Sequence, residues 1–316
     1  MVSSSQPQSN VGESVWSRVD RLVDRFLTVE QLYLHGLHLL AARRWRALGR
    51  PVPDELVASE HAARAAIDDA LVVLERVRAA VSGRIVLLHG LEVAASYPDR
   101  ALRSFGDLDL LVESEPEARA ALLRAGFEEI EADGPLPLVW PDRPVPLELF
   151  DRPRWVDGLP APAAAELVSR AQPSSTGVEG IEALPPLEHA LVVAANAWAH
   201  KPLRRARDLV DAAALTATLD RAALDAAARD WRMGRLWATT IGAADALLSG
   251  RPTLPLRLWA RDVWGLREQS FRDRLLRHYL AVFWALPARP AVRATARTLL
   301  RDARRISAGS SRPRTG

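Results

Sequence analysis

The sequence has no cysteine, a single lysine (Lys201) and only two methionines among its 316 residues. Without cysteine the chain cannot form disulfides, cysteine-ligated zinc sites or iron–sulfur clusters, so any catalysis must use oxygen or nitrogen groups. The chain also lacks a run of about 18 apolar residues that could cross a bilayer. Its first ten residues are polar and do not have the pattern of a secretion signal. We therefore expect a cytoplasmic protein with no transmembrane segment.

The chain also carries little net charge. The 42 basic residues outnumber the 39 acidic residues by only three, and 48% of the residues are hydrophobic, as in ordinary globular proteins. The basic excess is concentrated in residues 289–316, which contain eight arginines and one aspartate. The rest of the chain is therefore mildly acidic, and nucleic acid is not the favoured partner.

Helical patterns flank a central region of strand patterns. Apolar residues recur at helical spacing in 15–45, which fits two short helices or one kinked helix, and again in 54–82. From Pro185 onward, helical segments are separated by proline, glycine or capping residues, and no strand is predicted. The expected divisions are a disordered lead-in (1–14), an N-terminal helical region (15–82), a core domain (83–184), a C-terminal all-helical domain (185–306) and a flexible basic tail (307–316).

The central region is typical of a small mixed sheet. Short apolar runs predict strands at 85–88, 107–112, 127–131, 136–140 and 145–150. One helix is expected after Gly90, and another between Ser114 and Gly126. The predicted fold class is therefore α/β (α+β), with the sheet flanked by helices.

Two aspartates begin one of the predicted strands. Because side chains alternate along a strand, Asp107 and Asp109 share one face, while Leu108 and Leu110 share the other. Two ionised carboxylates side by side are unfavourable unless a cation or hydrogen-bond donors compensate them, and oxygen ligands favour Mg²⁺ or Mn²⁺. The alternative is a structural pair that accepts hydrogen bonds from loop amides.

Two neighbouring features strengthen the metal hypothesis. Gly90 lies at a helix start, where the missing side chain lets a phosphate approach backbone N–H groups, although a plain turn glycine also fits. Glu148 lies on the polar side of another predicted strand; it could also be a solvated residue, with Asp142 or Asp151 in its place. Three carboxylates beside a phosphate cradle are typical of two-metal phosphoryl transfer.

These residues resemble the nucleotidyltransferase fold and, within it, the bacterial group described as uncharacterised nucleotidyltransferases. The resemblance covers roughly residues 70 to 250. The motifs that carry it are His89-Gly90, Tyr97-Pro98-Asp99, Arg103, the DLDLLV segment Asp107–Val112, Gly126-Phe127, Leu147-Glu148-Leu149, the segment Pro185–His189, His200 and the segment Arg207–Asp211.

The resemblance implies a Mg²⁺-dependent enzyme. It would move a nucleoside monophosphate from an NTP to a hydroxyl of an acceptor and release pyrophosphate. Asp107, Asp109 and Glu148 would be the metal ligands and catalytic residues, and Glu148 would also act as the base. The acceptor and the preferred base are not indicated by the sequence.

The chain departs from the family pattern at three positions. The family often has a lysine where His89 stands, the broader fold has a serine where Leu91 stands, and a histidine is replaced by Phe150. A protonated His89 could supply the missing positive charge. The same departures would suit a non-catalytic nucleotide-binding or scaffold protein.

Arginines near the motifs are candidate phosphate ligands. Arg103 lies four residues before Asp107, where either a surface salt bridge or a phosphate clamp fits. Arg204 and Arg207 belong to a polar stripe at helical spacing that begins at His200 and ends at Asp211. Such a stripe can be solvated, but the family position favours one that faces the cleft.

A second row of arginines lies near the C-terminus. Arg289, Arg293, Arg297, Arg301 and Arg305 recur every four residues. Like charges at this spacing destabilise a helix slightly, so a partner such as RNA, anionic lipid or an acidic protein could compensate. Ordinary solvation of an arginine-rich sequence also fits. A protein anchored to RNA by this helix is therefore a further alternative.

Overall fold

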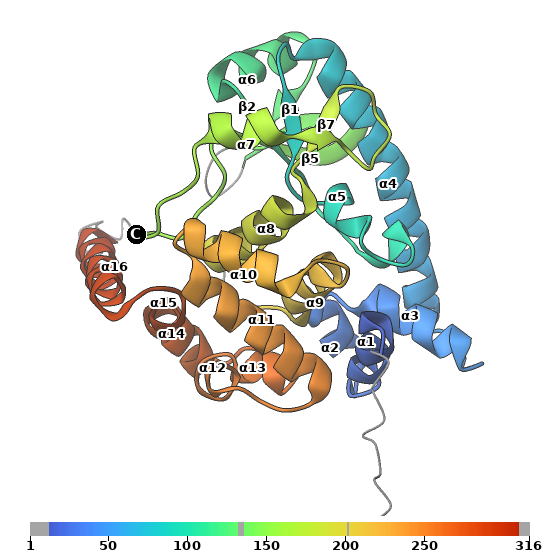
Figure 1. Cartoon of the computed structure of the whole chain (residues 1–316). Helices are drawn as coiled ribbons and strands as arrows, with labels where there is room; N and C mark the ends of the chain where they lie inside the picture. Colours follow the sequence, from blue (N-terminus) through green and yellow to red (C-terminus); the bar gives the residue numbers. More distant parts are fainter. Residues whose placement is uncertain (1–12, 132–135, 201, 310–316) are drawn as a thin grey trace, which may run out of the picture.

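The structure is a computed structural model, and it describes residues 13–131, 136–200 and 202–309. One seven-stranded sheet lies at one end of the described chain, and most helices lie at the other (Figure 1). The strand order is β3-β4-β5-β2-β1-β7-β6. The strands are β1 (Ile85–Leu87), β2 (Leu108–Val112), β3 (Glu128–Glu129), β4 (Leu138–Trp140), β5 (Arg143–Phe150), β6 (Gln172–Pro173) and β7 (Ile181–Ala183).

The helices fall into an N-terminal, a central and a C-terminal group. The first two groups are α1 (Val15–Val23), α2 (Val29–His35), α3 (His38–Ala47), α4 (Asp54–Ala80), α5 (Leu91–Ala94), the 3-10 turn η1 (Arg100–Leu102), α6 (Glu115–Arg124) and α7 (Ala164–Arg170). The C-terminal group is α8 (Pro186–His200), α9 (Ala206–Thr216), α10 (Arg221–Asp230), α11 (Gly234–Ser249), α12 (Leu254–Leu258), α13 (Arg261–Trp264), α14 (Phe271–Leu280), α15 (Val282–Ala285) and α16 (Ala288–Gly309).

Strand β2 is the centre of the sheet and carries the DLDLLV motif. It runs parallel to β5, and Asp109 lies directly opposite Glu148 in the register. Its other neighbour, β1, is antiparallel. Leu108 and Leu110 face α4 and α6, whereas Leu111 packs on the opposite face with residues of α7 and α8. By alternation, Asp109 shares the face of Leu111 and points toward α8.

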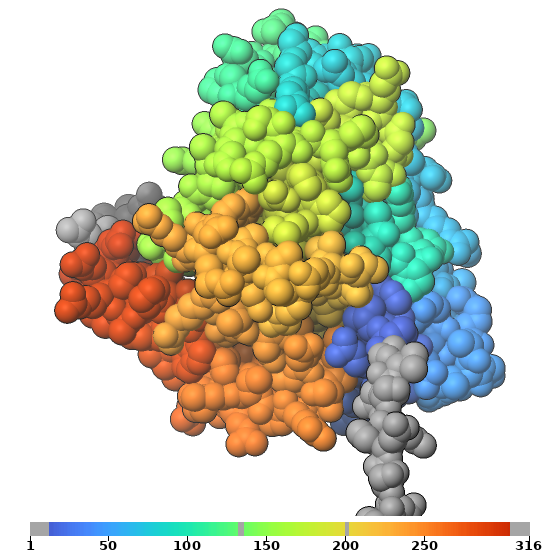
Figure 2. All heavy atoms as spheres, in the orientation of Figure 1, coloured from blue at the N-terminus to red at the C-terminus, as the bar shows by residue number. Residues whose placement is uncertain are grey.

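The N-terminal helices share a core with the C-terminal helices. Val19 and Leu22 of α1 are buried in one cluster with Leu209 of α9, Trp237 of α11 and Trp259. The long helix α4 instead packs on the sheet. Figure 2 shows the sheet-bearing part of the chain stacked on this helical part. The packing brings two helical groups far apart in the sequence to the same side of the sheet.

The predicted fold class is confirmed: the sheet is mixed, with helices before and after it. Among the described residues from Pro185 on, no strand occurs. None of the described helices has the length and apolar character needed to cross a membrane. Residues 1–12 of the predicted lead-in and 310–316 of the predicted tail lie outside the described residues.

Some predicted elements differ in detail. Residues 15–47 form three helices, because Gly36 adopts a φ of +69° that ends α2. The polar stripe expected at helical spacing from His200 is interrupted, because helix α9 begins only at Ala206, after a loop in which Leu203 has a φ of +45°. The segment 164–183, where no element was predicted, contains α7, β6 and β7. Strands of two or three residues are too short to produce a clear alternating pattern.

Candidate active site

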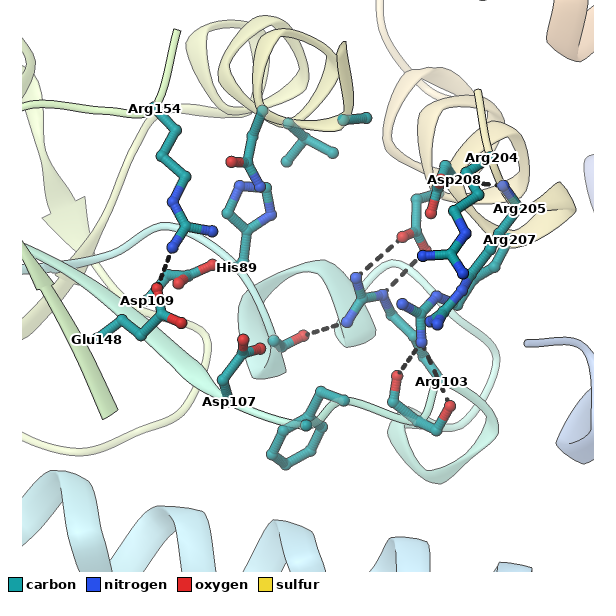
Figure 3. A pocket seen from close by; sticks show the side chains of 18 of the residues that line it. His89, Arg103, Asp107, Asp109, Glu148, Arg154, Arg204, Arg205, Arg207 and Asp208 are labelled. Atoms are coloured by element: carbon teal, nitrogen blue, oxygen red, sulfur yellow. Dashed lines mark hydrogen bonds and ion pairs between the residues drawn. The ribbon is translucent and has the colours of Figure 1, made fainter. Parts of the chain in front are cut away.

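A cavity of about 640 Å³ lies between the start of β2, the neighbouring part of β5 around Glu148, and the start of α9. All eight sequence-predicted site residues line it: His89, Gly90, Arg103, Asp107, Asp109, Glu148, Arg204 and Arg207. Figure 3 shows Asp107, Asp109 and Glu148 on one side and Arg204, Arg205 and Arg207 on the other, where Asp208 also lies. The fold therefore brings these residues together, and their chemical roles remain predictions.

The acidic wall is built on two paired strands. Asp107 precedes β2, Asp109 lies within it and is 7% exposed, and Glu148 comes from β5. Burial, together with the charges of Asp107 and Glu148, raises the pKa of Asp109 to about 7. One oxygen of this carboxylate, Oδ1, is buried and has no hydrogen-bond partner in the described structure. Burial also raises the pKa of Glu148.

Arg154 is a site residue that the sequence analysis missed. Its guanidinium forms an ion pair with Glu148 and lies 4.9 Å from the ring centre of Phe150. Phe150 replaces the histidine of the family pattern, so its ring contributes a cation–π contact that holds Arg154 against the acidic wall. The residue follows Glu148 in a loop with no recognisable motif, and arginine is abundant in this chain. Its position therefore had no sequence signal.

The acidic wall suits a cation that brings further ligands with it. Within the described residues, no three acidic or histidine side chains are arranged as a ready metal site. Mg²⁺, however, is commonly held by one or two carboxylates together with substrate phosphates and water. The unpartnered Oδ1 of Asp109 beside Asp107 fits that ligand set. Arg154 pairs with Oε2 of Glu148 and would compete with a cation for that oxygen. Mg²⁺ binding stays a prediction.

Replacing Arg154 with glutamine should strengthen binding of a divalent cation to the metal-free protein. The substitution removes a positive charge that competes for Glu148, and we expect the Mn²⁺ dissociation constant to fall about three- to tenfold. Titration followed by the electron paramagnetic resonance of free Mn²⁺ measures this constant. Arg152→Gln, an exposed arginine of the same loop, is the matched control. Weaker Mn²⁺ binding in the Arg154 variant would contradict the competition.

His89 does not supply the charge of a lysine. It is 9% exposed, and burial together with the nearby His189 lowers its pKa to about 3, so the ring is neutral near pH 7. Burial therefore disfavours the protonated form in which His89 could replace a lysine. Its Nε2 atom is buried and has no hydrogen-bond partner among the described residues. His89 is thus a neutral residue of the cavity wall with one buried nitrogen that is not hydrogen-bonded there.

Gly90 occupies a backbone conformation that other residues rarely adopt. Its φ is +69° with a ψ of −113°, and an added Cβ would lie 3.1 Å from the carbonyl oxygen of Asp107. The following helix, α5, is a single turn. The glycine is thus required both for the turn and for the close approach of the strand that carries the aspartates.

Alanine at position 90 should be destabilising and should also disturb the acidic wall. We expect a loss of about 1–3 kcal/mol in the free energy of unfolding, because of backbone strain and the contact with Asp107. Urea denaturation measures it. Gly126→Ala is the matched control, because Gly126 has a φ of +92° but open space around its Cβ position. Both variants should lose stability, and only the Gly90 variant should bind Mn²⁺ more weakly. Equal Mn²⁺ binding in the two would contradict the role of the close contact.

Arg103 forms a buried ion pair, not the surface salt bridge that was one of the two expectations. It is 7% exposed, and its Nε and Nη2 atoms each donate to Asp211 at 2.9 Å. Its Nη1 atom donates to the carbonyl of Gly90 at 3.2 Å, and the Tyr97 hydroxyl donates to Asp211 at 2.6 Å. Burial alone would raise the pKa of Asp211, but Arg103 holds it below its usual value. The pair ties the loop before β2 to α9.

The predicted polar stripe is not continuous. Helix α8 ends at His200 and α9 begins at Ala206, so Arg204 lies in the loop between them. Asp211 is buried against Arg103 and is neither solvated nor aimed at Arg204. Arg207 lies on α9 and donates to the carbonyl of Ser104 at 2.8 Å. No hydrogen bond or ion pair involves the Arg204 guanidinium within the described chain, which leaves it available to an anion.

The cavity is electrically divided (Figure 3). Asp107, Asp109 and Glu148, with Arg154 paired to Glu148, form one wall, and the facing edge carries Arg204, Arg205 and Arg207 together with Asp208. Such a cavity can hold a cation and a multiply charged anion at the same time, with the anion bridging the two sides. This is the arrangement that a metal-bound polyphosphate requires.

Comparison with known proteins agrees with this geometry. The family model described as uncharacterised nucleotidyltransferase matches residues 23–249, which include both acidic strands and the arginine-bearing loop. No curated protein and no solved structure matches the chain. The matched segment covers well over half of the sequence. The chain therefore belongs to the uncharacterised nucleotidyltransferase family.

Proposed function

We propose that the protein is a Mg²⁺-dependent nucleotidyltransferase that moves a nucleoside monophosphate from an NTP to a hydroxyl of an acceptor. Family membership supports nucleotidyl transfer in general. The observation that carries the finer proposal is the buried, unpartnered Oδ1 of Asp109, which lies beside Asp107 and opposite Glu148, across the cavity from unpaired arginine. A lone structural pair of aspartates would have its oxygens satisfied by loop amides.

Each residue has a distinct part in the proposed reaction. Asp107 and Asp109 would hold Mg²⁺, which neutralises charge on the triphosphate when it is bound. The acceptor oxygen forms a bond to the α-phosphorus while the bond to pyrophosphate breaks, and the hydroxyl proton passes to Glu148. Burial raises the pKa of Glu148, which makes it a better proton acceptor once Arg154 has moved. Arg204 and Arg207, which line the same cavity, would contact the leaving pyrophosphate.

Calorimetric titration with each NTP, with and without Mg²⁺, tests the proposal. The wild type should bind at least one NTP about tenfold or more tightly with Mg²⁺ than without it, and Asp107→Asn should lose this difference. Asp142→Asn, in the exposed turn between β4 and β5, is the matched control and should behave as the wild type. Equal binding with and without Mg²⁺ in all three proteins would refute the assignment of the metal to the aspartates.

One observation favours a second candidate, a non-catalytic nucleotide-binding protein on the same fold. Arg154 already forms an ion pair with Glu148. In addition, His89, which is neutral, Leu91 and Phe150 depart from the family pattern. In that case NTP would bind with Mg²⁺, but no pyrophosphate would be released with any acceptor in a broad panel of sugars, nucleosides and peptides. Pyrophosphate release with any member of the panel would exclude this candidate.

A further inference from the structure

A second cavity of about 640 Å³ lies beside the active site, on the far side of the α8–α9 loop. Its walls come from the loop after β5, the end of α8, helix α14 and helix α16. Trp155, Val156, Trp198, Ala281 and Ala294 supply apolar surface. Arg204 lines both cavities, so the two spaces meet at this side chain.

The charges of this cavity are not balanced. Among the described residues, five arginines line it against one aspartate, whereas the first cavity has five arginines and five acids. Arg301 approaches Asp157 only to 3.9 Å, with both side chains mostly exposed, and Arg277 is already paired with Asp262. Within the described chain, Arg274 and Arg297 have no acidic partner. Uncompensated positive charge around a concave, partly apolar space is the signature of an anion-binding pocket.

The arginines are held by a defined helix–helix contact. His278 and Tyr279 of α14 both bond to Asp302 of α16, at 2.8 Å and 3.0 Å. Thr295 of α16 donates to the carbonyl of Tyr279 at 3.1 Å. These bonds fix the two helices that carry Arg274 and Arg297. Arg274 and Arg297 therefore line the cavity from two anchored helices; both side chains are exposed, and the Arg274 guanidinium lies 5.9 Å from the ring centre of Phe271.

The cavity also divides the arginine row of α16. Arg297 and Arg301 line the cavity, whereas Arg289 and Arg293 do not, and all four side chains are exposed. An extended anionic surface such as a membrane would use the whole row. A small anion would use only the two residues that face the cavity. Enclosure by Trp155 and Trp198 favours the small molecule.

We propose that this second cavity binds the acceptor, a small hydroxyl-bearing molecule that carries a phosphate or carboxylate group. The anionic group would lie against Arg274 and Arg297, and the hydroxyl would extend past Arg204 to the acidic wall of the first cavity. Its oxygen would then bond to the α-phosphorus of the NTP as pyrophosphate leaves and its proton passes to Glu148. The inference rests on the proposed function, and it names the class of acceptor.

The test compares two paired variants by calorimetry in Mg²⁺-free buffer. The probes are glucose 6-phosphate, glucose and inorganic phosphate. We expect glucose 6-phosphate and phosphate to bind the wild type, and glucose not to bind. In R274Q/R297Q the affinity for both anions should fall about tenfold or more, since each lost charge-assisted hydrogen bond contributes substantially. The control R289Q/R293Q removes the same charge from the same region outside the cavity and should bind as the wild type.

Three outcomes would overturn the inference. The first is an anion affinity that is the same in R274Q/R297Q and in the wild type. The second is equal loss in both paired variants, which would indicate a general charge effect. The third is binding to vesicles containing phosphatidylglycerol that depends on Arg289 and Arg293 as much as on the cavity arginines, without binding of glucose 6-phosphate. That result would identify a membrane-facing surface.

Titration of the same proteins with Mg²⁺ and NTP separates the two hypotheses. R274Q/R297Q should keep NTP affinity within about twofold of the wild type, since neither residue lines the first cavity. If NTP binds normally and the anions do not distinguish the variants, only the acceptor site is refuted. If no protein shows Mg²⁺-dependent NTP binding while the anions behave as expected, the proposed function fails and the anion pocket remains.

Discussion

Replacing Asp109 with asparagine is expected to stabilise the metal-free protein and at the same time to remove Mg²⁺-dependent nucleotide binding. The carboxylate is 7% exposed, lies beside two other acids, and has an oxygen without a partner in the described structure. Its pKa of about 7, compared with an ordinary value of about 3.9, corresponds to a penalty of about 4 kcal/mol when the group is ionised. A neutral asparagine avoids this penalty, so the free energy of unfolding can increase by a few kcal/mol.

The stability difference should depend on pH with a defined sign. In the unfolded chain Asp109 loses its proton near pH 4, whereas in the folded protein it keeps the proton up to about pH 7. Between these values the folded state binds more protons, so the wild type loses stability as the pH rises. The advantage of Asp109→Asn should therefore be small at pH 4, grow toward pH 7 and stay constant above it. Urea denaturation at several pH values, without divalent ions, measures this profile.

Although Asp109→Asn should stabilise the metal-free protein, it should weaken nucleotide binding. Loss of a direct ligand should weaken Mg²⁺-dependent NTP binding about a hundredfold or more. Asp151→Asn, an exposed acid that follows β5, should change neither property. A structural aspartate pair predicts the reverse pattern, in which asparagine destabilises the protein and leaves nucleotide binding intact. Asp109→Asn thus separates the two interpretations of the DLD motif in one variant.

The parts of the site that the sequence predicts are those carried by local patterns. Alternation along 107–112 places Asp107 and Asp109 on one face, and the structure has them at the start of β2 with Leu108 and Leu110 turned to the opposite core. The polar position of Glu148 among apolar neighbours likewise places it on the cavity side of β5. The alternation of side chains is a local property of a strand, so one sequence is enough to infer it.

The parts that escape prediction depend on contacts between distant residues. Arg103 and Asp211 are 108 positions apart, and nothing in either local pattern indicates that they pair. Arg154 reaches Glu148 through an irregular loop, and its position is set by the ring of Phe150. The second cavity is lined by α8, α14 and α16, and helical periodicity alone does not specify how these helices pack against one another.

Breaking the Arg103–Asp211 pair is expected to give the largest loss of stability in the cavity. Arg103→Met leaves a buried carboxylate that keeps only the Tyr97 hydroxyl as a donor, and Asp211→Leu leaves a buried guanidinium with only the Gly90 carbonyl. Removing one partner of a buried ion pair typically costs about 3–5 kcal/mol, because the remaining charge stays desolvated. Urea denaturation of each single variant should show a loss of this size.

The double variant Arg103→Met/Asp211→Leu provides the control. Replacement of both charges by apolar groups of similar size removes the uncompensated charge, so most of the lost stability should return. The interaction energy from the four proteins then measures the coupling between the two residues. If the double variant were as unstable as the sum of the single variants, the two residues would act independently and the pair would not be the reason for the loss.

The same four proteins distinguish the two roles considered for Arg103. A phosphate clamp predicts that both variants lacking Arg103 bind Mg²⁺–NTP poorly, including the double variant, whose fold is restored. A structural tie predicts that the double variant recovers a large part of its nucleotide affinity along with its stability, because Arg207 still joins α9 to the Ser104 carbonyl. The buried geometry favours the tie, since Arg103 already uses Nε and Nη2 on Asp211 and Nη1 on Gly90. Arg103 is thus expected to position the aspartates by joining their loop to the helical domain, and Arg204 and Arg207 remain to contact phosphate.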